Sequence, residues 1–469
     1  MRKLIAAGAA ALLLLSGCTV GPKYRRPAVK TPDVFRGADP NTAADPASVA
    51  ELKWFEVFKD AELQKLIRTA LVSNYDLREA VARVSAARAN LGIVRSDQFP
   101  SIVPSVGITT IENSKGGAIP LPEGVARGHT FGSVLINLLS FEVDVWGRLR
   151  RATEAARANL LSTEETRKAV ITTLVGDVAT AYFNLIELDA ELEIDKRTLA
   201  GREDSLRLIR SREQGGVATM LDVRQAEQLV YTASIAIPET ERRIDQAENQ
   251  ISFLVGNNPG PVQRGSSLND QEKPAAVPPG LPSSLLERRP DIRAAEENLI
   301  AANATIGVAR AAYFPQISLT GFLGFESNQL SNLFSGSRSA WNFAPRIAQP
   351  IFSGGRLKSN VKLAKAQRDI LLVQYERTIQ TAFREVSDAL VQYARIKEIR
   401  TQQELLVATL QDRARLSYLR YRGGVDTLLN ALDADRDLFS AELSLSQIKR
   451  DELLALVQLY KALGGGWKE

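Results

Sequence analysis

The chain has 469 residues, 45% of them hydrophobic and 24% charged, with a formal net charge of +5 at pH 7. This composition is typical of a folded protein and excludes a chain that is disordered throughout. Lys and Arg alternate with Asp and Glu and form no basic block, which argues against nucleic-acid binding. The single histidine and single cysteine exclude a histidine-clustered zinc site and an internal disulfide.

The N-terminus has the features of a bacterial lipoprotein signal. A short basic segment precedes an apolar stretch that is too short to span a bilayer, and small residues follow. We expect residues 1–17 to be a signal peptide with the lipobox Leu15, Ser16, Gly17 and Cys18; a secretory signal with an incidental cysteine is the alternative. Cys18 would carry acyl chains such as palmitate at the start of an anchored segment, residues 18–60. Thr19 indicates sorting to the Gram-negative outer membrane, because Asp at that position retains lipoproteins at the inner one.

The rest of the chain contains one unit twice. The motif NYDLREA, which begins at Asn74, is similar to RPDIRAA, which begins at Arg289, and a Gly-Gly-Val triplet occurs at 215–217 and again at 423–425. Similar motifs in the same order indicate an internal duplication. Each copy is expected to contain a helix, two strands, a long helix and a return helix. The expected divisions are repeat 1 at residues 61–258, a linker at 259–284 and repeat 2 at 285–466.

Each repeat has a proline-free stretch long enough for an exceptional helix. Residues 148–212 and 356–422 would each form a helix of about 100 Å at 1.5 Å per residue. In the first, apolar residues alternate at spacings of three and four, as in a coiled-coil seam. The glycine pairs that follow predict tight reversals into return helices at 219–255 and 427–463. Pro238 predicts a kink or a break in the first return helix.

Four segments have strand features. Residues 130–145 and 315–326 alternate apolar and polar side chains, as a tilted transmembrane strand does. Residues 101–112 and 341–352 are less regular and contain prolines, which weakens the prediction there. Four strands cannot close a barrel in a membrane, so several chains must share one barrel.

Five motifs complete the pattern: CTVGPKYRRP from Cys18, LLERRPDIRAAE from Leu285, AAYFPQISLTGFLG from Ala311, YRGGVDTLLNALDADRDLFSAE from Tyr421 and LYKALGGGW from Leu459. With these motifs the sequence resembles the TolC family of outer-membrane factors of tripartite efflux and secretion systems. The resemblance is closest to the lipoprotein, OprM-like branch of that family, which works with RND-type pumps.

The resemblance implies a mixed fold, an all-α coiled-coil barrel joined to a transmembrane β-barrel, in a homotrimer that shares a 12-stranded barrel. It implies a passive channel and not an enzyme, with no cofactor or metal beyond covalent lipid on Cys18. The implied partners are the outer membrane, a periplasmic adaptor and an inner-membrane RND-type transporter. Multidrug or small-molecule efflux is the expected activity. With two methionines and one histidine, the chain has no stretch rich in these residues that would favour metal export.

The resemblance also assigns roles to the hairpin tips, which form the periplasmic entrance in the family. It places Leu429 at an apolar constriction and Asp433, one helical turn further on, at an acidic ring. Asn430 stands where TolC has a second acid, so a double acidic ring is not implied. Asp222 of repeat 1 is equivalent to Asn430, and one role open to it is to hold the tip through contacts with a neighbouring helix. The adaptor is expected to dock at Gly215, Gly216, Val217, Gly423, Gly424 and Val425.

Each assignment has an ordinary alternative. Asp433 is also favourable near a helix N-terminus, Leu429 suits helix packing, and paired glycines suit any turn. A pore-less periplasmic coiled-coil scaffold or adaptor lipoprotein would share the anchor and the hairpins, but it would need no amphipathic strands. A catalytic triad built on His129 is not excluded by counting, but no GxSxG elbow is present, and we expect His129 in a loop or at a barrel end.

Overall fold

The computed structural model describes residues 19–38, 48–114, 124, 126–274 and 278–467. The chain divides into two compact units, and each unit takes residues from both repeats. We call residues 1–28, 84–163 and 295–375 the strand unit, and residues 29–83, 164–294 and 376–469 the hairpin unit.

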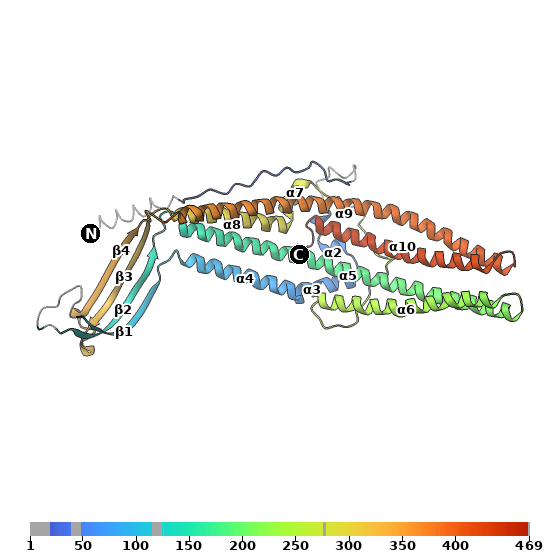
Figure 1. Ribbon diagram of the computed structural model, residues 1–469, viewed down its shortest axis with the longest axis horizontal. Coiled ribbons are helices and arrows are strands. Elements are labelled where there is room, and N and C mark those ends of the chain that lie inside the picture. The colour runs from blue at the N-terminus through green and yellow to red at the C-terminus, as the bar shows by residue number, and fades with distance from the viewer. Residues whose placement is uncertain (1–18, 39–47, 115–123, 125, 275–277, 468–469) are drawn as a thin grey trace. The chain divides into compact units, whose positions relative to one another are not determined.

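The strand unit contains one antiparallel sheet whose strands follow one another in chain order (Figure 1). Repeat 1 contributes the first two strands and repeat 2 the last two, so the pairing of the second strand with the third joins the repeats. The outer two strands are open edges within the single chain. The strands are β1 (Ile102–Glu112), β2 (Gly128–Glu142), β3 (Gln316–Ser327) and β4 (Ser339–Ala348).

One face of this sheet is apolar across all four strands. The register places Ile136 opposite Pro104 and Leu323, and Leu323 opposite Trp341. The side chains of Ile136, Leu323 and Trp341 are 55%, 62% and 74% exposed. Such a row of bare apolar side chains is what a strand surface in contact with lipid requires.

The strands differ most from the sequence-based expectation at the ends of β2 and β4. β2 ends at Glu142 rather than 145, after a bulge between Leu138 and Phe141 that breaks the predicted alternation. Beyond it, Asp144 accepts hydrogen bonds from the backbone of the next helix instead of extending the strand. β4 ends at Ala348 rather than 352, two residues before Pro350, which cannot donate to the ladder.

Prolines lie inside both edge strands, β1 and β4. Leu139 N of β2 donates to Ser101 O at 3.0 Å, so the backbone of residue 101 faces β2. Every second residue of an antiparallel strand bonds to the same partner, so residue 103 also faces β2 and residue 104 faces away from it. The nitrogen of Pro104 therefore lies on the open side of β1, where the missing N–H costs no bond within the chain.

Helices make up most of the rest of the described chain. The two long ones, α5 and α9, have 67 residues each and begin with an arginine that follows a glycine of positive φ. The helices are α2 (Trp54–Val57), α3 (Ala61–Ser73), α4 (Tyr75–Ser96), α5 (Arg148–Gln214), α6 (Met220–Leu254), α7 (Pro282–Arg288), α8 (Pro290–Ala311), α9 (Arg356–Arg422) and α10 (Leu428–Ala462). Short 3₁₀ helices are η1 (Val49–Glu51), η2 (Leu330–Asn332) and η3 (Gly336–Arg338).

The expected break at Pro238 does not occur, because α6 is a single helix from Met220 to Leu254. Pro238 and Ser234, whose carbonyl loses its helical donor, are both exposed. Water can therefore hydrate that carbonyl, which lowers the cost of the proline. On the opposite, buried side Thr240 donates to Asp195 of α5 at 2.9 Å and helps to hold the helix in place.

Candidate channel gate and docking tips

Both long helices end in the same glycine turn. In the first hairpin, Val217 N donates to Arg212 O (2.9 Å) and Gly216 N donates to Glu213 O (2.8 Å), with Gly216 at φ 74°. The second hairpin repeats both bonds, from Val425 N to Arg420 O and from Gly424 N to Tyr421 O, with Gly424 at φ 73°. This is the Schellman motif, in which glycine takes a left-handed conformation that other residues rarely adopt.

The turns leave their valines bare. Val217 is 68% exposed and Val425 66%, although the residue at this position of a Schellman motif often packs back on its helix. Met220 and Leu221, at the start of α6, are also more than half exposed. The tips therefore present apolar side chains that nothing in the described chain covers.

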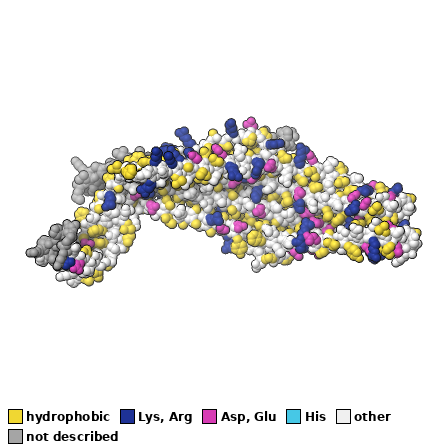
Figure 2. All heavy atoms as spheres, in the orientation of Figure 1, with side chains coloured by type: hydrophobic (Ala, Val, Ile, Leu, Met, Phe, Trp, Pro, Cys, Tyr) yellow, Lys and Arg dark blue, Asp and Glu magenta, His cyan; other side chains and the backbone are white. Residues whose placement is uncertain are grey.

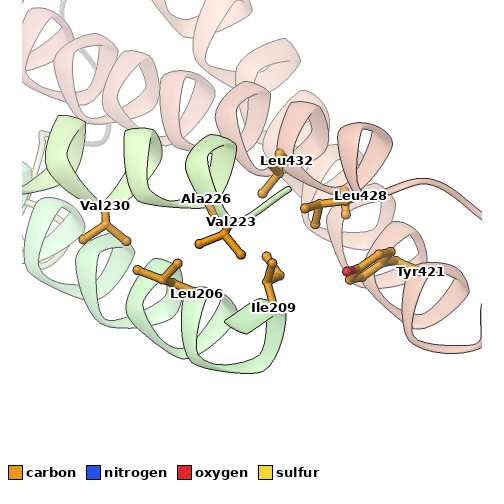
Figure 3. Close-up of a cluster of buried hydrophobic side chains, with 9 residues drawn as sticks. Leu206, Ile209, Val223, Ala226, Val230, Tyr421, Leu428 and Leu432 are labelled. Carbon is orange, nitrogen blue, oxygen red and sulfur yellow. The ribbon is translucent and has the colours of Figure 1, made fainter. Parts of the chain in front are cut away.

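A buried cluster lies just behind the tips and draws on all four hairpin helices (Figure 3). Its members are Leu206 and Ile209 of α5, Val223, Ala226 and Val230 of α6, Tyr421 of α9, and Leu428, Ala431 and Leu432 of α10. Arg212 lies over the Tyr421 ring at 4.9 Å from its centre, a cation–π contact between α5 and α9. The two hairpins thus form one packed body at this level.

This packing determines which face of α10 remains free. Leu428, Ala431 and Leu432 are spaced by three and four residues, so they occupy one face of the helix, which is the buried one. Leu429 is 55% exposed, and the side chain of Asp433 is 38% exposed. The two predicted gate residues lie one turn apart on a face that the chain does not use for its own core.

The acid at the predicted gate has a cationic neighbour. Asp433 forms an ion pair with Arg436, three residues along α10, at 3.0 Å. Both side chains are partly exposed to solvent, so the pair is weak and can exchange for other partners. Arg436 therefore offsets part of the charge that the sequence predicted for the acidic ring at Asp433.

Asn430 is part of the turn's own structure. Its amide donates to Asp426 Oδ1 at 2.6 Å, and Asp426 also accepts from Thr427 N and pairs with Arg420 at 3.1 Å. The pKa of Asp426 lies below its ordinary value, mainly because of the hydrogen bond from Asn430 and, next in size, the one from Arg420. In repeat 1, Asp222 forms a capping box with Thr219 at the start of its own helix.

Charged pairs that the sequence analysis missed connect α5 to α10. Arg202 donates to Asp435 at 2.8 Å, and its side chain is only 3% exposed. Two further pairs are Arg197 with Glu442 (2.7 Å) and Glu187 with Arg450 (3.3 Å). Arg202 and Asp195 occupy positions of the otherwise apolar seam of α5. Charged residues at seam positions could have indicated buried polar contacts between the helices.

The predicted lipid site, Cys18, lies outside the described residues. Immediately after it, Val20 N donates to Trp146 O at 3.0 Å and Arg151 donates to the Val20 carbonyl at 3.2 Å. Further along, Arg26 forms an ion pair with Glu296 of α8, whose side chain is only 8% exposed. The segment after the expected lipid attachment therefore docks onto the strand unit.

Charge is distributed differently over the two kinds of structure. Charged side chains are rare on the strands, whereas Lys and Arg intermingle with Asp and Glu over the helices on the visible face (Figure 2). Among the described residues, no group of three or more His, Cys, Asp or Glu side chains has the arrangement of a metal site.

The comparisons with known proteins agree with this architecture. The family model described as outer membrane efflux protein matches residues 66–257 and 281–465, one match for each repeat. The chain belongs to the outer membrane efflux protein family. The predicted family and the predicted duplication are therefore confirmed.

Similar proteins cover nearly the whole chain. The probable efflux pump outer membrane protein TtgC of Pseudomonas putida is 39% identical over 100% of this chain and 97% of TtgC. The outer membrane protein OprJ of Pseudomonas aeruginosa is 37% identical over 98% of this chain and 96% of OprJ. The structure of the open state of the MtrE outer membrane channel of Neisseria gonorrhoeae matches with a TM-score of 0.87 and 33% identity, covering 96% of this chain and 99% of MtrE.

Membership establishes the class of function. The structural relatives are trimeric channels in which a helical barrel adjoins a β-barrel, which confirms the predicted fold class. The protein is an outer-membrane channel of a tripartite efflux pump that works with an adaptor and an inner-membrane transporter. The pore-less scaffold is the weaker alternative, and the family is one of transport channels.

Proposed function

We propose that this channel is the exit duct for small apolar toxic molecules and that Leu429 and Asp433 of α10 close its periplasmic entrance. The observation that carries the gate is the free face of α10: a leucine and an acid remain exposed beside a cluster that buries their neighbours. The cargo class is supported by relatives named for the efflux of antibiotics, toluene and solvents, each matched over nearly the whole chain.

The gate would act through two physical effects. Three copies of Leu429 facing one axis narrow the entrance and exclude water from it. Three copies of Asp433 attract cations and resist close approach while they are ionised, and Arg436 moderates both effects. Asn430 is neutral and occupied with Asp426, so the entrance has one acidic ring rather than two.

The adaptor would bind at the glycine tips. The Schellman turns fix the backbone at Gly215, Gly216, Gly423 and Gly424, and the bare side chains of Val217 and Val425 supply apolar contact area. A rigid turn with exposed apolar residues loses little conformational entropy on binding.

Covalent lipid on Cys18 would add a membrane anchor. The support for it is the lipobox and the docking of the following segment, through Val20, onto the strand unit. One acyl chain holds a protein only marginally, but acylation combined with an embedded barrel gives stable attachment. No other bound group is part of this proposal.

The gate is tested by single-channel conductance in a planar bilayer. The variant Leu429→Ala/Asp433→Ala should conduct markedly more than the native trimer, because it widens the constriction and removes its charge. The matched control is Leu405→Ala/Asp412→Ala. Leu405 is 59% exposed, and Asp412 pairs with Arg415 three residues along its helix, so this control changes the same residue types elsewhere. Equal conductance of native and gate variants would refute the gate assignment.

The cargo is tested separately in cells. A host that lacks its own outer-membrane efflux channel, supplied with the protein and its cognate pump, should tolerate higher concentrations of toluene and apolar antibiotics. Unchanged susceptibility to these compounds, in cells where the channel reaches the outer membrane, would contradict the proposed cargo but not the gate.

A further inference from the structure

The base of the sheet is defined by its antiparallel topology. β1 and β3 begin there, and β2 and β4 end there. Four short junctions therefore lie at this end of the strand unit, two from each repeat. They are the segments before β1 (97–101), after β2 (143–147), before β3 (312–315) and after β4 (349–355).

Within the chain, the junction after β2 packs against the junction before β3. The ring of Trp146 stacks on Phe314 with centroids 4.8 Å apart and an interplanar angle of 26°. Its Nε1 donates to Pro315 O at 2.9 Å, and Val143 N donates to Ile317 O at 2.8 Å. Trp146 and Phe314 are both partly buried as a result.

The two remaining junctions have polar contacts within the chain, such as Gln349 Nε2 with Tyr313 O at 2.8 Å, but their large apolar side chains stay exposed. Phe99-Pro100 before β1 is the repeat 1 counterpart of Phe314-Pro315, and Phe99 is 60% exposed. After β4, Ile351 is 97% exposed and Phe352 90%, the most exposed large apolar side chains in the described chain. Full exposure of two adjacent large apolar residues is unfavourable in water and marks an interaction site.

Phe352 occupies a helix-capping position but cannot cap its helix. Gly147-Arg148 matches Gly355-Arg356, and the residues three positions before these glycines are Asp144 and Phe352. Asp144 accepts hydrogen bonds from Leu149 N (3.1 Å) and Arg150 N (2.9 Å) and so caps α5. A phenyl ring can accept no such bond, so repeat 2 gives up a stabilising cap here for an exposed aromatic side chain.

The surroundings of the two junctions also differ. The N-terminal segment covers the junction after β2, since a Cβ added at Gly147 would lie 2.8 Å from Thr19 Cγ2. Added Cβ atoms at Gly354 and Gly355 would meet nothing within 4 Å. The chain has only one N-terminal segment, so the second junction needs a cover from elsewhere.

We propose that Ile351 and Phe352 of one copy pack against Phe99 and Pro100 of the next copy, as a repeated apolar joint between chains at the base of the barrel. A shared barrel places β4 of each copy beside β1 of the next, which brings these two junctions together. The joint repeats between chains the contact that Trp146 and Phe314 make within one chain. The occupant of the bare surface is therefore a second copy of this chain.

The test is cysteine cross-linking of the full lipoprotein in membranes. The variant Phe99→Cys/Phe352→Cys, treated with a short bismaleimide, should give bands of two and three covalently joined chains on a denaturing gel. The matched variant Trp146→Cys/Phe314→Cys should cross-link only within one chain. Each single variant measures the background from Cys18. Single-chain bands from the first variant, where the second reacts within its chain, would overturn the proposal.

A second measurement does not depend on cysteine reactivity. Phe352→Asp should lower the fraction of trimer at a fixed protein concentration in detergent at least tenfold, because it places three charges in apolar joints. Leu330→Asp, which also replaces an exposed apolar residue of the strand unit, should leave that fraction unchanged. If Phe352→Asp kept the trimer intact and impaired only membrane insertion, the junction would contact lipid and the proposed joint would be wrong.

Discussion

Among single residues, the buried acids of α5 are the least expected from the sequence. Glu187 and Asp195 are each 1% exposed, and Asp195 occupies a position of the apolar seam. Burial raises the pKa of the Glu187 carboxyl above its ordinary value of 4.5, and the nearby Arg450 lowers it less. The carboxyl faces Arg450 and Ser446 of α10, Glu191 of its own helix and Arg243 of α6.

This environment predicts a pH dependence of stability. A carboxyl whose pKa is higher in the folded than in the unfolded state binds more protons when folded, so the free energy of unfolding falls as pH rises through and above 4.5. Glu187→Gln lacks this ionisation. Its melting temperature relative to the native protein should therefore increase from about pH 4 to about pH 8.

The control for this prediction is Glu193→Gln, which changes an exposed acid of the same helix. Its melting temperature should follow that of the native protein across the same range. A constant difference between Glu187→Gln and the native protein would show that Glu187 has the same pKa in both states.

The turn glycines allow a second prediction at this scale. Gly424 has φ 73° and open space around it, so Gly424→Ala introduces backbone strain without a clash and should destabilise the tip by about 1 kcal/mol. Gly201 lies inside α5, also in open space, and Gly201→Ala should stabilise the protein by about 0.5–1 kcal/mol. Denaturant unfolding of both variants checks the opposite signs, and two changes of the same sign would contradict the argument.

At the scale of elements, helices were easier to predict than strands. The helices end at glycine turns and caps, and these are local signals that the sequence displays directly. The strand ends depend on partners: β2 stops where Asp144 turns to cap α5, and its bulge follows from pairing with β3. Of the kink or break that Pro238 predicted, the break does not occur, because the cost of a proline depends on solvent exposure, which the sequence does not display.

The contact between α5 and α10 predicts how strongly one buried arginine stabilises the packing of the two helices. Arg202 donates to Asp435 and to Leu229 O (3.2 Å) and lies over the Phe439 ring. Arg202→Ala leaves these groups without their cation and should destabilise the joined hairpins by about 3 kcal/mol. Amide hydrogen exchange near the start of α10 should accelerate in this variant.

The matched control is Arg207→Ala. Arg207 lies in the same helix and pairs with Asp204, but both side chains are about two-thirds exposed. Its loss should cost about 0.5 kcal/mol or less and leave exchange in α10 unchanged. Equal acceleration in the two variants would show that burial of Arg202 contributes nothing to the joint.

For the whole molecule, the duplication explains both what the sequence revealed and what it hid. Matched motifs showed two repeats, and strand count showed that several chains must share a barrel. The contacts that distinguish the repeats are not visible in such matches. Repeat 1 has Asp144 where repeat 2 has Phe352. Only the structure shows that Asp144 caps its helix while Phe352 is exposed to solvent.

The N-terminal segment supplies the last prediction, because it ties the expected lipid anchor to the fold. Arg26 donates to Glu296 through Nε (2.8 Å) and Nη2 (2.5 Å), and Tyr24 donates to the same carboxylate at 3.2 Å. Arg26→Ala removes the Arg26 cation from the buried Glu296, which costs about 3 kcal/mol unless the segment detaches and water reaches the carboxylate.

We expect detachment, since a terminal segment opens at lower cost than the whole fold. Thermolysin should therefore cleave Arg26→Ala within residues 19–38 faster than the native trimer, while the helices stay intact. Lys23→Ala, which changes an exposed basic residue of the same segment, should be cleaved at the native rate. Equal cleavage of native protein and Arg26→Ala would mean that other contacts hold the segment, and that the anchor is joined to the strand unit independently of Glu296.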